Sequence, residues 1–267
     1  PPSVILIIYS ILTEQNIAKM FLAAFIPGVL AALGYITAIA IYVRFFPTSG
    51  PNKKKVDFST RLSLFRDIWH VLLIFFIVIG GIYLGWFTPT EGAAVGAAGT
   101  GLIAVFNKNF SLDNFFEVIN DTAVTTAMIF LVLLGAEFFN SFIALSRVTN
   151  ILSETILGYN YSPFTIVAII LLIYIFLGCL MDSLAMILLT IPVFFPVIIQ
   201  LDFGMSYEET AIWFGILTLI VVEVGLITPP VGLNAFIINK IAGDIPIKET
   251  FKGVLPFLIS DFLRVIL

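Results

Sequence analysis

The chain has 267 residues, of which 60% are hydrophobic and 11% charged, with a formal net charge of −4. Soluble domains are usually about 45–50% apolar and about 25% charged, so this composition excludes an ordinary soluble protein. The single cysteine, Cys179, excludes a disulfide within the chain. Several apolar stretches reach the roughly 20 residues that a membrane crossing needs. The sequence therefore predicts an all-α polytopic membrane protein embedded in a lipid bilayer.

The chain contains two similar segments. Residues 1–30 and 229–259 both begin with a proline pair and continue as a short apolar helix, and each has a proline eight residues after a lysine. Pro27 and Pro256 are thereby related by an offset of 229 residues. Internal repeats of this kind are common in secondary transporters. We expect a first copy of the intervening part, roughly 200 residues long, to precede the chain.

Residues 1–45 are predicted to end the first repeat, with half of a broken helix at 3–16 and a span at 21–45. Residues 46–67 are predicted to form a cytoplasmic loop whose second part is an amphipathic arm on the membrane surface. The cytoplasmic assignment rests on the basic residues Lys53, Lys54, Lys55, Arg61 and Arg66.

Residues 68–145 are predicted to hold three scaffold-type spans. The spans lie at 68–87, 89–106 and 122–145, with a polar connector at 107–120. Glu91 is expected to have an interfacial or helix-start role in preference to a role in transport, and the small residues from Gly92 to Gly101 favour close helix packing. Glu137, with Asn140 and Ser141, is expected to face a neighbouring subunit or a moving domain. Residues 146–162 form a connector or a second arm.

Residues 163–200 are apolar over 38 residues, interrupted only by the sequence GCLMDS at 178–183. Two full crossings would need about 40 residues and a loop outside the membrane. We therefore predict a re-entrant hairpin of two short helices in preference to a plain span. The distribution of charge agrees, because a hairpin makes the acidic loop 201–209 external and the lysine-bearing segment 240–252 cytoplasmic.

Residues 208–243 are predicted to be one broken helix, and residues 251–267 a terminal span. The sequence GLITPPVG at 225–232 combines two prolines, two glycines and a threonine. It predicts eight non-helical residues between half-helices of about 15 and about 11 residues. If residues 163–200 form a hairpin, the segments that contain the two proline pairs cross the membrane in opposite directions. The two repeats are then inverted relative to one another.

This break is a candidate binding site. Non-helical backbone at membrane depth occurs where it is buried in protein or lines a polar cavity. Each proline frees a carbonyl four residues earlier, and Thr228 adds a hydroxyl, so the break offers oxygen ligands that suit Na⁺. Half-helix N-termini beside the break suit an anion. The structural alternative is a proline kink that binds nothing.

Asp182 lies at the tip of the predicted hairpin. An ionisable side chain inside a membrane is costly and is a functional candidate. It would polarise the cation site, accept hydrogen bonds from substrate hydroxyls, or both. The alternative is a tip close enough to water to solvate the carboxylate.

Several kinds of chemistry have no supporting motif in the chain. His70 is the only histidine and is expected to be structural, and with one cysteine the chain offers no His/Cys metal site. It has no phosphate-binding glycine loop with a lysine and no Ser–His nucleophile motif. The chain is therefore not expected to be an enzyme or to bind nucleic acid.

Four motifs together resemble a known family. GWFTPTEGAAV, GCLMDSLAMILLTIPVFFPVI, GLITPPVGLNAF and the earlier PPS…YSILTEQNIAKMFLAAFIPG are similar to the large membrane subunit of the tripartite ATP-independent periplasmic (TRAP) transporters. The resemblance runs through nearly the whole chain. It implies a multi-pass protein of the bacterial inner membrane that imports an organic acid with Na⁺ as coupling ion. The implied fold is an inverted-repeat, elevator-type transporter with a re-entrant hairpin and discontinuous helices.

The resemblance also implies the site residues. The second Na⁺ site would use Gly225, Thr228, Pro229 or Pro230, and the hairpin-tip backbone at Gly178 and Met181. The first Na⁺ site would receive only Pro1 and Pro2 from this chain. The substrate pocket would include Asp182, Ser183, Asn234 and, from the first repeat, Ser3.

The implied partners are a small four-helix membrane subunit, separate or fused, and a periplasmic substrate-binding protein. Sialic acids and C4-dicarboxylates are both family substrates, with sialic acid as the preferred expectation. The main alternative is a Na⁺/carboxylate symporter of a related fold that works without a binding protein. A membrane-embedded enzyme and an ion channel are more distant alternatives.

Overall fold

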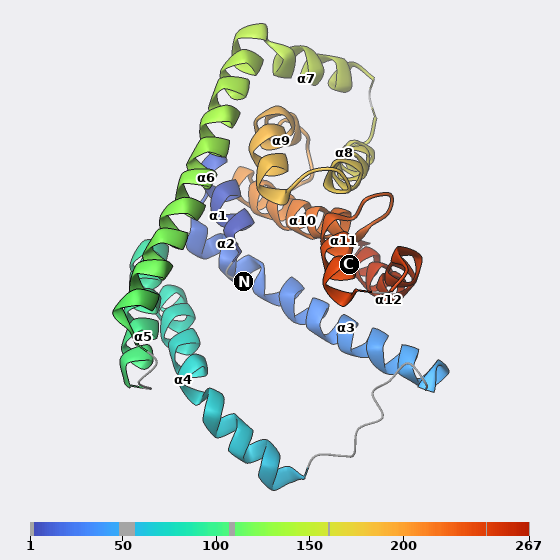
Figure 1. Ribbon diagram of the computed structural model, residues 1–267. Coiled ribbons are helices and arrows are strands. Elements are labelled where there is room, and N and C mark those ends of the chain that lie inside the picture. Colours follow the sequence, from blue (N-terminus) through green and yellow to red (C-terminus); the bar gives the residue numbers. More distant parts are fainter. Residues whose placement is uncertain (1–2, 48–56, 107–109, 160, 244, 267) are drawn as a thin grey trace. The chain divides into compact units, whose positions relative to one another are not determined.

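The computed structural model describes residues 3–47, 57–106, 110–159, 161–243 and 245–266 (Figure 1). The predictions on Pro1, Pro2 and the lysines at 53–55 lie outside the described residues, as do the side chains of Arg61 and Arg66. The described residues form helices and no strands, so the all-α prediction is confirmed. They fall into two compact units, Pro1–Pro47 with Val132–Leu267 (unit 1) and Thr48–Leu131 (unit 2).

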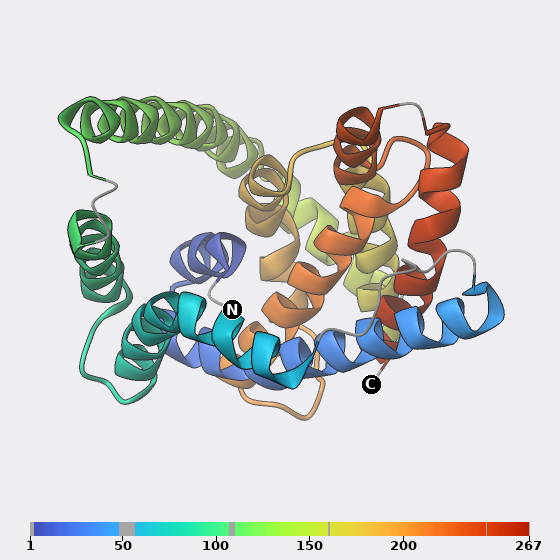
Figure 2. The ribbon, with the colours of Figure 1, turned by 60° about the horizontal axis from the view of Figure 1, so that its bottom comes forward.

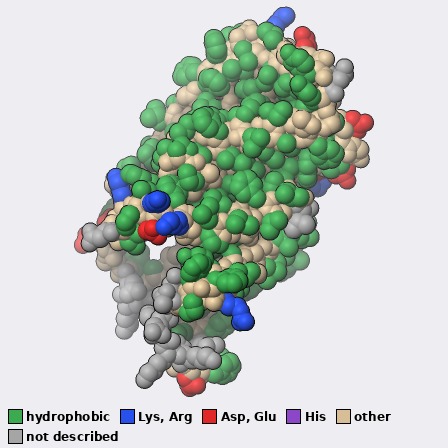
Figure 3. All heavy atoms as spheres, turned by 90° about the vertical axis from the view of Figure 1, so that its right-hand side faces the viewer, with side chains coloured by type: hydrophobic (Ala, Val, Ile, Leu, Met, Phe, Trp, Pro, Cys, Tyr) green, Lys and Arg blue, Asp and Glu red, His purple; other side chains and the backbone are tan. Residues whose placement is uncertain are grey.

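The apolar helices agree with a polytopic membrane protein. Among the described residues, Ile17–Phe45, Leu112–Ser146 and Tyr207–Ile227 are long and apolar enough to cross a membrane. Phe58–Phe65 and Ile68–Tyr83, which meet at 54°, make a fourth span if they are counted as one. Hydrophobic side chains dominate the face seen in Figure 3, and large apolar side chains are exposed on most helices. Such a surface is suited to contact with lipid or with other apolar helices.

Unit 2 contains α4 (Phe58–Tyr83), α5 (Pro89–Phe106) and the first part of α6 (Leu112–Ser146). α5 packs closely on α4 through its glycines. A Cβ atom added to Gly92 would lie 2.9 Å from Ile82 Cδ1, and one added to Gly99 would lie 3.3 Å from the side chain of Ile74. The close packing expected from the small-residue run is therefore confirmed.

Glu91 has the helix-start role that the sequence suggested. Its Oε2 accepts hydrogen bonds from the Thr88 backbone N–H at 2.7 Å and from the Thr88 hydroxyl at 2.9 Å. The polar connector expected at 107–120 is shorter than predicted, because α6 begins at Leu112. Asp113 lies in the first turn of α6, where a carboxylate stabilises the positive end of a helix.

Unit 1 contains the remaining helices. They are α1 (Val4–Leu12), α2 (Ile17–Ala23), α3 (Phe25–Phe45), the rest of α6, α7 (Val148–Gly158), α8 (Pro163–Gly178), α9 (Ser183–Ile198), α10 (Tyr207–Ile227), α11 (Leu233–Ala242) and α12 (Ile247–Ile266). Most of the segment 146–162, predicted to be a connector or an arm, forms the helix α7.

α10 is the central helix of unit 1 and contacts α1, α8, α9 and α12 (Figures 1 and 2). Tyr9 of α1 is buried against it, and its hydroxyl donates a hydrogen bond to the Ala211 carbonyl at 2.6 Å. The ring of Tyr9 occupies the space beside Gly215, where an added Cβ atom would lie 2.5 Å from Tyr9 Cε1. Helix α1 therefore packs directly on α10.

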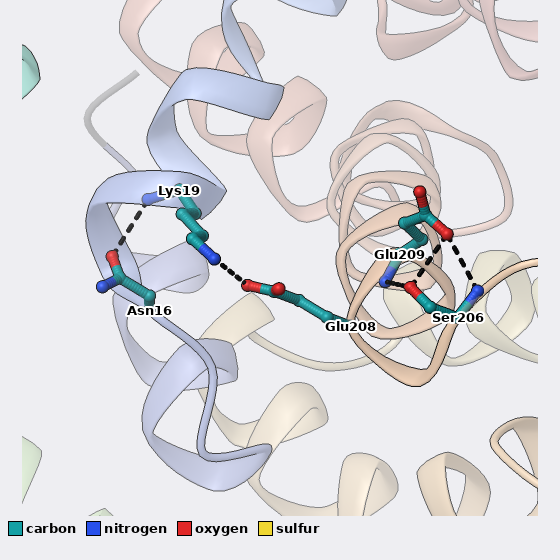
Figure 4. A network of polar contacts seen from close by, with 5 residues as sticks. All are labelled: Asn16, Lys19, Ser206, Glu208 and Glu209. Atoms are coloured by element: carbon teal, nitrogen blue, oxygen red, sulfur yellow. Dashed lines mark hydrogen bonds and ion pairs between the residues drawn. The ribbon is translucent and has the colours of Figure 1, made fainter.

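The start of α10 is set by a capping box (Figure 4). Ser206 Oγ accepts from the Glu209 N–H, and Glu209 Oε2 accepts from the Ser206 N–H at 2.8 Å. Glu208 in the same turn forms a 2.6 Å ion pair with Lys19 of α2. Both partners are about half exposed, and a surface pair of this kind usually contributes about 1 kcal/mol or less.

The segment 163–200 is a helix–turn–helix, as predicted. α8 and α9 have 16 residues each, which gives each a length of about 24 Å, less than the roughly 30 Å of a hydrocarbon core. Two helices of this length suit a hairpin that turns within a membrane. The predicted break in 208–243 is also present, but α10 has 21 residues and not about 15. Residues 225–227 continue the helix, so the break covers five residues, 228–232, and not eight.

Candidate functional site

The hairpin tip, residues 179–182, and the helix break, residues 228–232, lie next to one another in unit 1 because α8 and α10 cross at two glycines. A Cβ atom added to Gly225 would lie 2.7 Å from the Cα of Gly178 and 3.1 Å from the Ile175 carbonyl oxygen. A Cβ atom added to Gly178 would lie 2.9 Å from the Cα of Gly225. Only glycine permits such a backbone contact. The structure thus brings together Gly178 and Gly225, which the family resemblance had assigned to one site.

Cys179 makes a second connection between the tip and the break. Its thiol lies 3.4 Å from the Pro229 carbonyl oxygen and 3.2 Å from the Ile175 carbonyl oxygen, at hydrogen-bonding distance for sulfur. The residue is 2% exposed. Sequence reasoning used Cys179 only to exclude a disulfide and a His/Cys metal site, and it missed this contact. The position of Cys179 directly after Gly178 was the available signal.

The end of α10 carries backbone oxygens without their usual helical partners. The carbonyls of Gly225 and Leu226 lie four residues before Pro229 and Pro230, which have no N–H to donate. The Gly225 carbonyl instead accepts from the Thr228 N–H at 3.0 Å. Gly225 therefore belongs to the last turn of α10, and its expected place inside the break was wrong.

Thr228 is half-buried at the start of the break. Its hydroxyl donates to the Val224 carbonyl at 2.6 Å, so the lone pairs of the hydroxyl oxygen are available as acceptors. Carbonyl and hydroxyl oxygens at one helix end form a donor set that suits a hard monovalent cation.

The helix ends around the site differ in the sign of their partial charge. α8 ends at Gly178 and α10 ends at Ile227, and a helix C-terminus carries a partial negative charge of roughly half an elementary charge. α9 and α11 begin on the other side of the tip and the break, and helix N-termini carry the opposite partial charge. The paired C-termini favour a cation, while the N-termini favour an anionic group.

Asp182 is the N-cap of α9. Its Oδ2 accepts from the Leu184 N–H at 3.0 Å and from the Ala185 N–H at 3.4 Å. The side chain is exposed at the surface of the described residues. This cap explains locally why α9 begins where it does. The capping leaves Asp182 Oδ1 for another partner, so the carboxylate is both a structural cap and a candidate ligand.

The other predicted site residues lie at three places. Met181 is half-buried at the tip, and Ser183 is the first residue of α9, next to Asp182. Asn234 is half-buried in the first turn of α11. Ser3 precedes α1, which packs on α9 and α10, but among the described residues no hydrogen bond joins its side chain to the tip or the break.

Sequence reasoning missed three charged residues within apolar helices. Asp261 and Arg264 of α12 form an ion pair at 2.9 Å, and Glu223 lies within the apolar helix α10. Charges inside long apolar segments were the signal that could have found them. Glu137, which was singled out, lines a separate pocket with Asn140 and Ser141, between α6, α7 and α9.

Comparison with known proteins matches the whole chain to one family. The family model described as "Tripartite ATP-independent periplasmic transporter, DctM component" matches residues 1–267. The sialic acid TRAP transporter permease protein SiaT of Haemophilus influenzae is 32% identical over all of this chain and 42% of its own length.

Two further relatives are large permease proteins. The C4-dicarboxylate TRAP transporter protein DctM of Pseudomonas aeruginosa is 30% identical over 97% of this chain and 58% of its own length. The sialic acid TRAP transporter protein SiaM of Vibrio cholerae is 31% identical over 98% of this chain and 60% of its own length. The chain thus spans about half the length of the curated relatives it matches. It belongs to the DctM component family of the tripartite ATP-independent periplasmic transporters, a family of transporter permeases and not of enzymes.

Proposed function

We propose that this chain is part of the membrane subunit of a Na⁺-coupled secondary transporter that imports an organic acid by an elevator movement. The observation that carries the proposal is the apposition of the hairpin tip and the helix break, with Gly178 and Gly225 in backbone contact. Relatives are named for sialic acid and for C4-dicarboxylates, so the proposed substrate is an acid of one of these two classes.

The coupling ion would bind where α8 and α10 end. The ligands proposed are the carbonyl oxygens at the end of α10, the Thr228 hydroxyl and the backbone of the tip at Gly178 and Met181. Pro229 and Pro230 contribute by removing N–H donors that would otherwise occupy those carbonyls. Both helix C-termini add partial negative charge. A divalent cation would be expected to require more carboxylate ligands than this donor set provides.

The substrate carboxylate would bind on the opposite side of the tip and break, at the N-termini of α9 and α11. Ser183 and Asn234 lie in the first turns of these helices and offer polar side chains there. Asp182 would accept hydrogen bonds from substrate hydroxyls through its uncommitted oxygen, and its charge would favour a bound cation nearby. Ser3 and the first Na⁺ site with Pro1 and Pro2 would belong to the inverted first repeat.

The proposed assembly follows from the family. A small four-helix membrane subunit, separate or fused, would accompany this chain in the bacterial inner membrane, and a periplasmic binding protein would deliver the acid. The names of the relatives support such a system, since they are permeases of tripartite transporters. The tip, the break and the helices packed on α10 would form the moving body of the elevator.

The test is uptake into proteoliposomes that contain the complete transporter with this chain. Labelled N-acetylneuraminic acid and labelled succinate are offered with the binding protein outside, under an inward Na⁺ gradient or a matched K⁺ gradient. Saturable uptake of one acid under the Na⁺ gradient alone is expected. Equal uptake under both gradients would refute the coupling.

The same assay addresses the alternatives. Uptake that persists without the binding protein would support the binding-protein-independent symporter. A flux that does not saturate with substrate would support a channel.

A further inference from the structure

A polar cluster joins α3 to α12 away from the candidate site. The Tyr35 hydroxyl donates a 2.7 Å hydrogen bond to Asp261 Oδ2, and Arg264 Nη2 lies 2.9 Å from Asp261 Oδ1. The side chains of Arg264 and Asp261 are only 14% and 2% exposed. One oxygen of a buried carboxylate therefore accepts a hydrogen bond from α3, and the other forms an ion pair with Arg264 of the same helix, α12.

α3 and α12 also approach each other closely at this crossing. A Cβ atom added to Gly34 would clash with Ser260 Oγ and would lie 3.6 Å from Ser260 Cβ. The Tyr35 ring meets Phe257 edge to face, with ring centroids 5.2 Å apart. We call the residues Gly34, Tyr35, Ser260, Asp261 and Arg264 the α3–α12 clasp. Its contacts fix both the spacing and the rotation of the two helices.

The clasp lies at related positions of the two repeats. Tyr35 and Arg264 are 229 residues apart, the offset that also relates Pro27 to Pro256. α12, the helix after α11, is thereby joined to α3, which holds the corresponding place after α1 in the first similar segment. Removal of Tyr35 or Arg264 would leave the Asp261 carboxylate short of a partner, which is strongly unfavourable for a buried charge.

The other end of α12 supports the helix break. Gly232, the last residue of the break, packs so closely on Phe251 of α12 that an added Cβ atom would lie 3.0 Å from Phe251 Cε1. Asn239 of α11 donates to the Thr250 hydroxyl of α12 at 2.9 Å. Phe251 and Asp261 are ten residues apart on one helix, about 15 Å along its axis. α12 therefore connects the α3–α12 clasp to the helix break.

We propose that Asp261 is a positioning residue for the candidate cation site. Held by Tyr35 and paired with Arg264, it fixes α12 to α3, and α12 in turn holds Gly232 and α11 in the arrangement that binds the ion. The inference rests on the proposed Na⁺ coupling. Asp261 itself does not touch the ion; it acts through Phe251 and Thr250.

The first test uses Asp261→Asn and Tyr35→Phe in the complete transporter. Each is expected to raise the Na⁺ concentration for half-maximal uptake by about fivefold or more, the lower end of usual coupling between distant sites. The maximal rate at saturating Na⁺ should fall much less. Tyr42→Phe is the matched control, because Tyr42 lies on α3 outside the clasp, next to Phe46, and should leave the Na⁺ titration unchanged.

The second test replaces the clasp by a covalent bond. The 3.6 Å separation between the added Cβ of residue 34 and Ser260 Cβ falls in the range of about 3.5–4.5 Å that a disulfide requires. The pair Gly34→Cys and Ser260→Cys, oxidised and confirmed by peptide mass, should transport with a normal Na⁺ titration. Combined with Asp261→Asn, the oxidised pair should restore the Na⁺ titration that Asp261→Asn alone had shifted.

Three outcomes separate the possibilities. An unchanged Na⁺ titration in both Asp261→Asn and Tyr35→Phe would overturn the positioning role, provided the unaltered transporter is Na⁺-dependent. Failure of the oxidised disulfide to rescue Asp261→Asn would also overturn it, since the charge and not the helix spacing would then matter. If the unaltered transporter needs no Na⁺, the proposed function itself fails. Tyr35→Phe keeps the test decisive if the cysteine pair or Asp261→Asn folds poorly.

Discussion

The glycine contact between α8 and α10 predicts a large effect of Gly225→Ala. The new Cβ would lie 2.7 Å from Gly178 Cα and 3.1 Å from the Ile175 carbonyl oxygen, both backbone atoms. Since carbon atoms in contact are usually about 3.5–4.0 Å apart, α8 and α10 would have to separate by about 1 Å. Overpacking of this kind costs about 1–3 kcal/mol.

The free-energy cost of Gly225→Ala would appear as weaker binding of the cation, because the substitution distorts the proposed cation site. A separation of the helices weakens the 3.4 Å contact of Cys179 with the Pro229 carbonyl and moves the tip backbone away from the break. If about 1–3 kcal/mol is lost from the ion-bound state, the Na⁺ concentration for half-maximal uptake rises by about 5- to 150-fold.

The assay for Gly225→Ala is a Na⁺ titration of uptake by the complete transporter in proteoliposomes, with the amount of folded protein measured by size-exclusion chromatography. Gly253→Ala is the matched control. It lies inside α12, and an added Cβ atom would meet no described atom within 4 Å. An unchanged Na⁺ titration in Gly225→Ala would refute the idea that this backbone contact shapes the ion site.

Three further predictions concern single side chains. Asp182→Asn should abolish or cripple uptake while the protein still folds, because asparagine also caps helices; uptake at the unaltered rate would remove Asp182 from the site. Thr228→Val should weaken the dependence of uptake on Na⁺, since a hydroxyl ligand is lost, and an unchanged titration would argue against that ligand. A double-mutant cycle of Lys19→Ala and Glu208→Ala should give a coupling of about 1 kcal/mol or less in the free energy of unfolding; a coupling of several kcal/mol would contradict the surface character of the pair.

Much of the helical architecture could be predicted from segment length and turn chemistry. The hairpin in 163–200 followed from an apolar run too short for two crossings, and GLITPPVG marked the break because proline cannot continue a helix. The small-residue run from Gly92 to Gly101 predicted close helix packing, and the structure shows that packing against α4. These features depend on local sequence, which a single chain carries in full.

The errors arose where a neighbouring structure decides the outcome. Residues 225–227 remain helical because the first missing N–H is at Pro229, and Gly225 serves the crossing with Gly178 in place of the break. The start of α6 at Leu112 was missed since its polar first turn resembles a loop. The charge of Asp261 inside an apolar segment was a signal, but its partner Tyr35, 226 residues earlier in the chain, could not be identified from the sequence. Contacts over such distances have no local signature.

The native residue Cys179 can be used to follow the contact between the hairpin tip and the helix break. It is the single thiol of the chain, it is 2% exposed, and it sits where the tip touches the Pro229 carbonyl. A maleimide can reach that sulfur only after the tip and the break have parted. The rate of alkylation of Cys179 would therefore report how often the tip and the break separate, without an engineered cysteine.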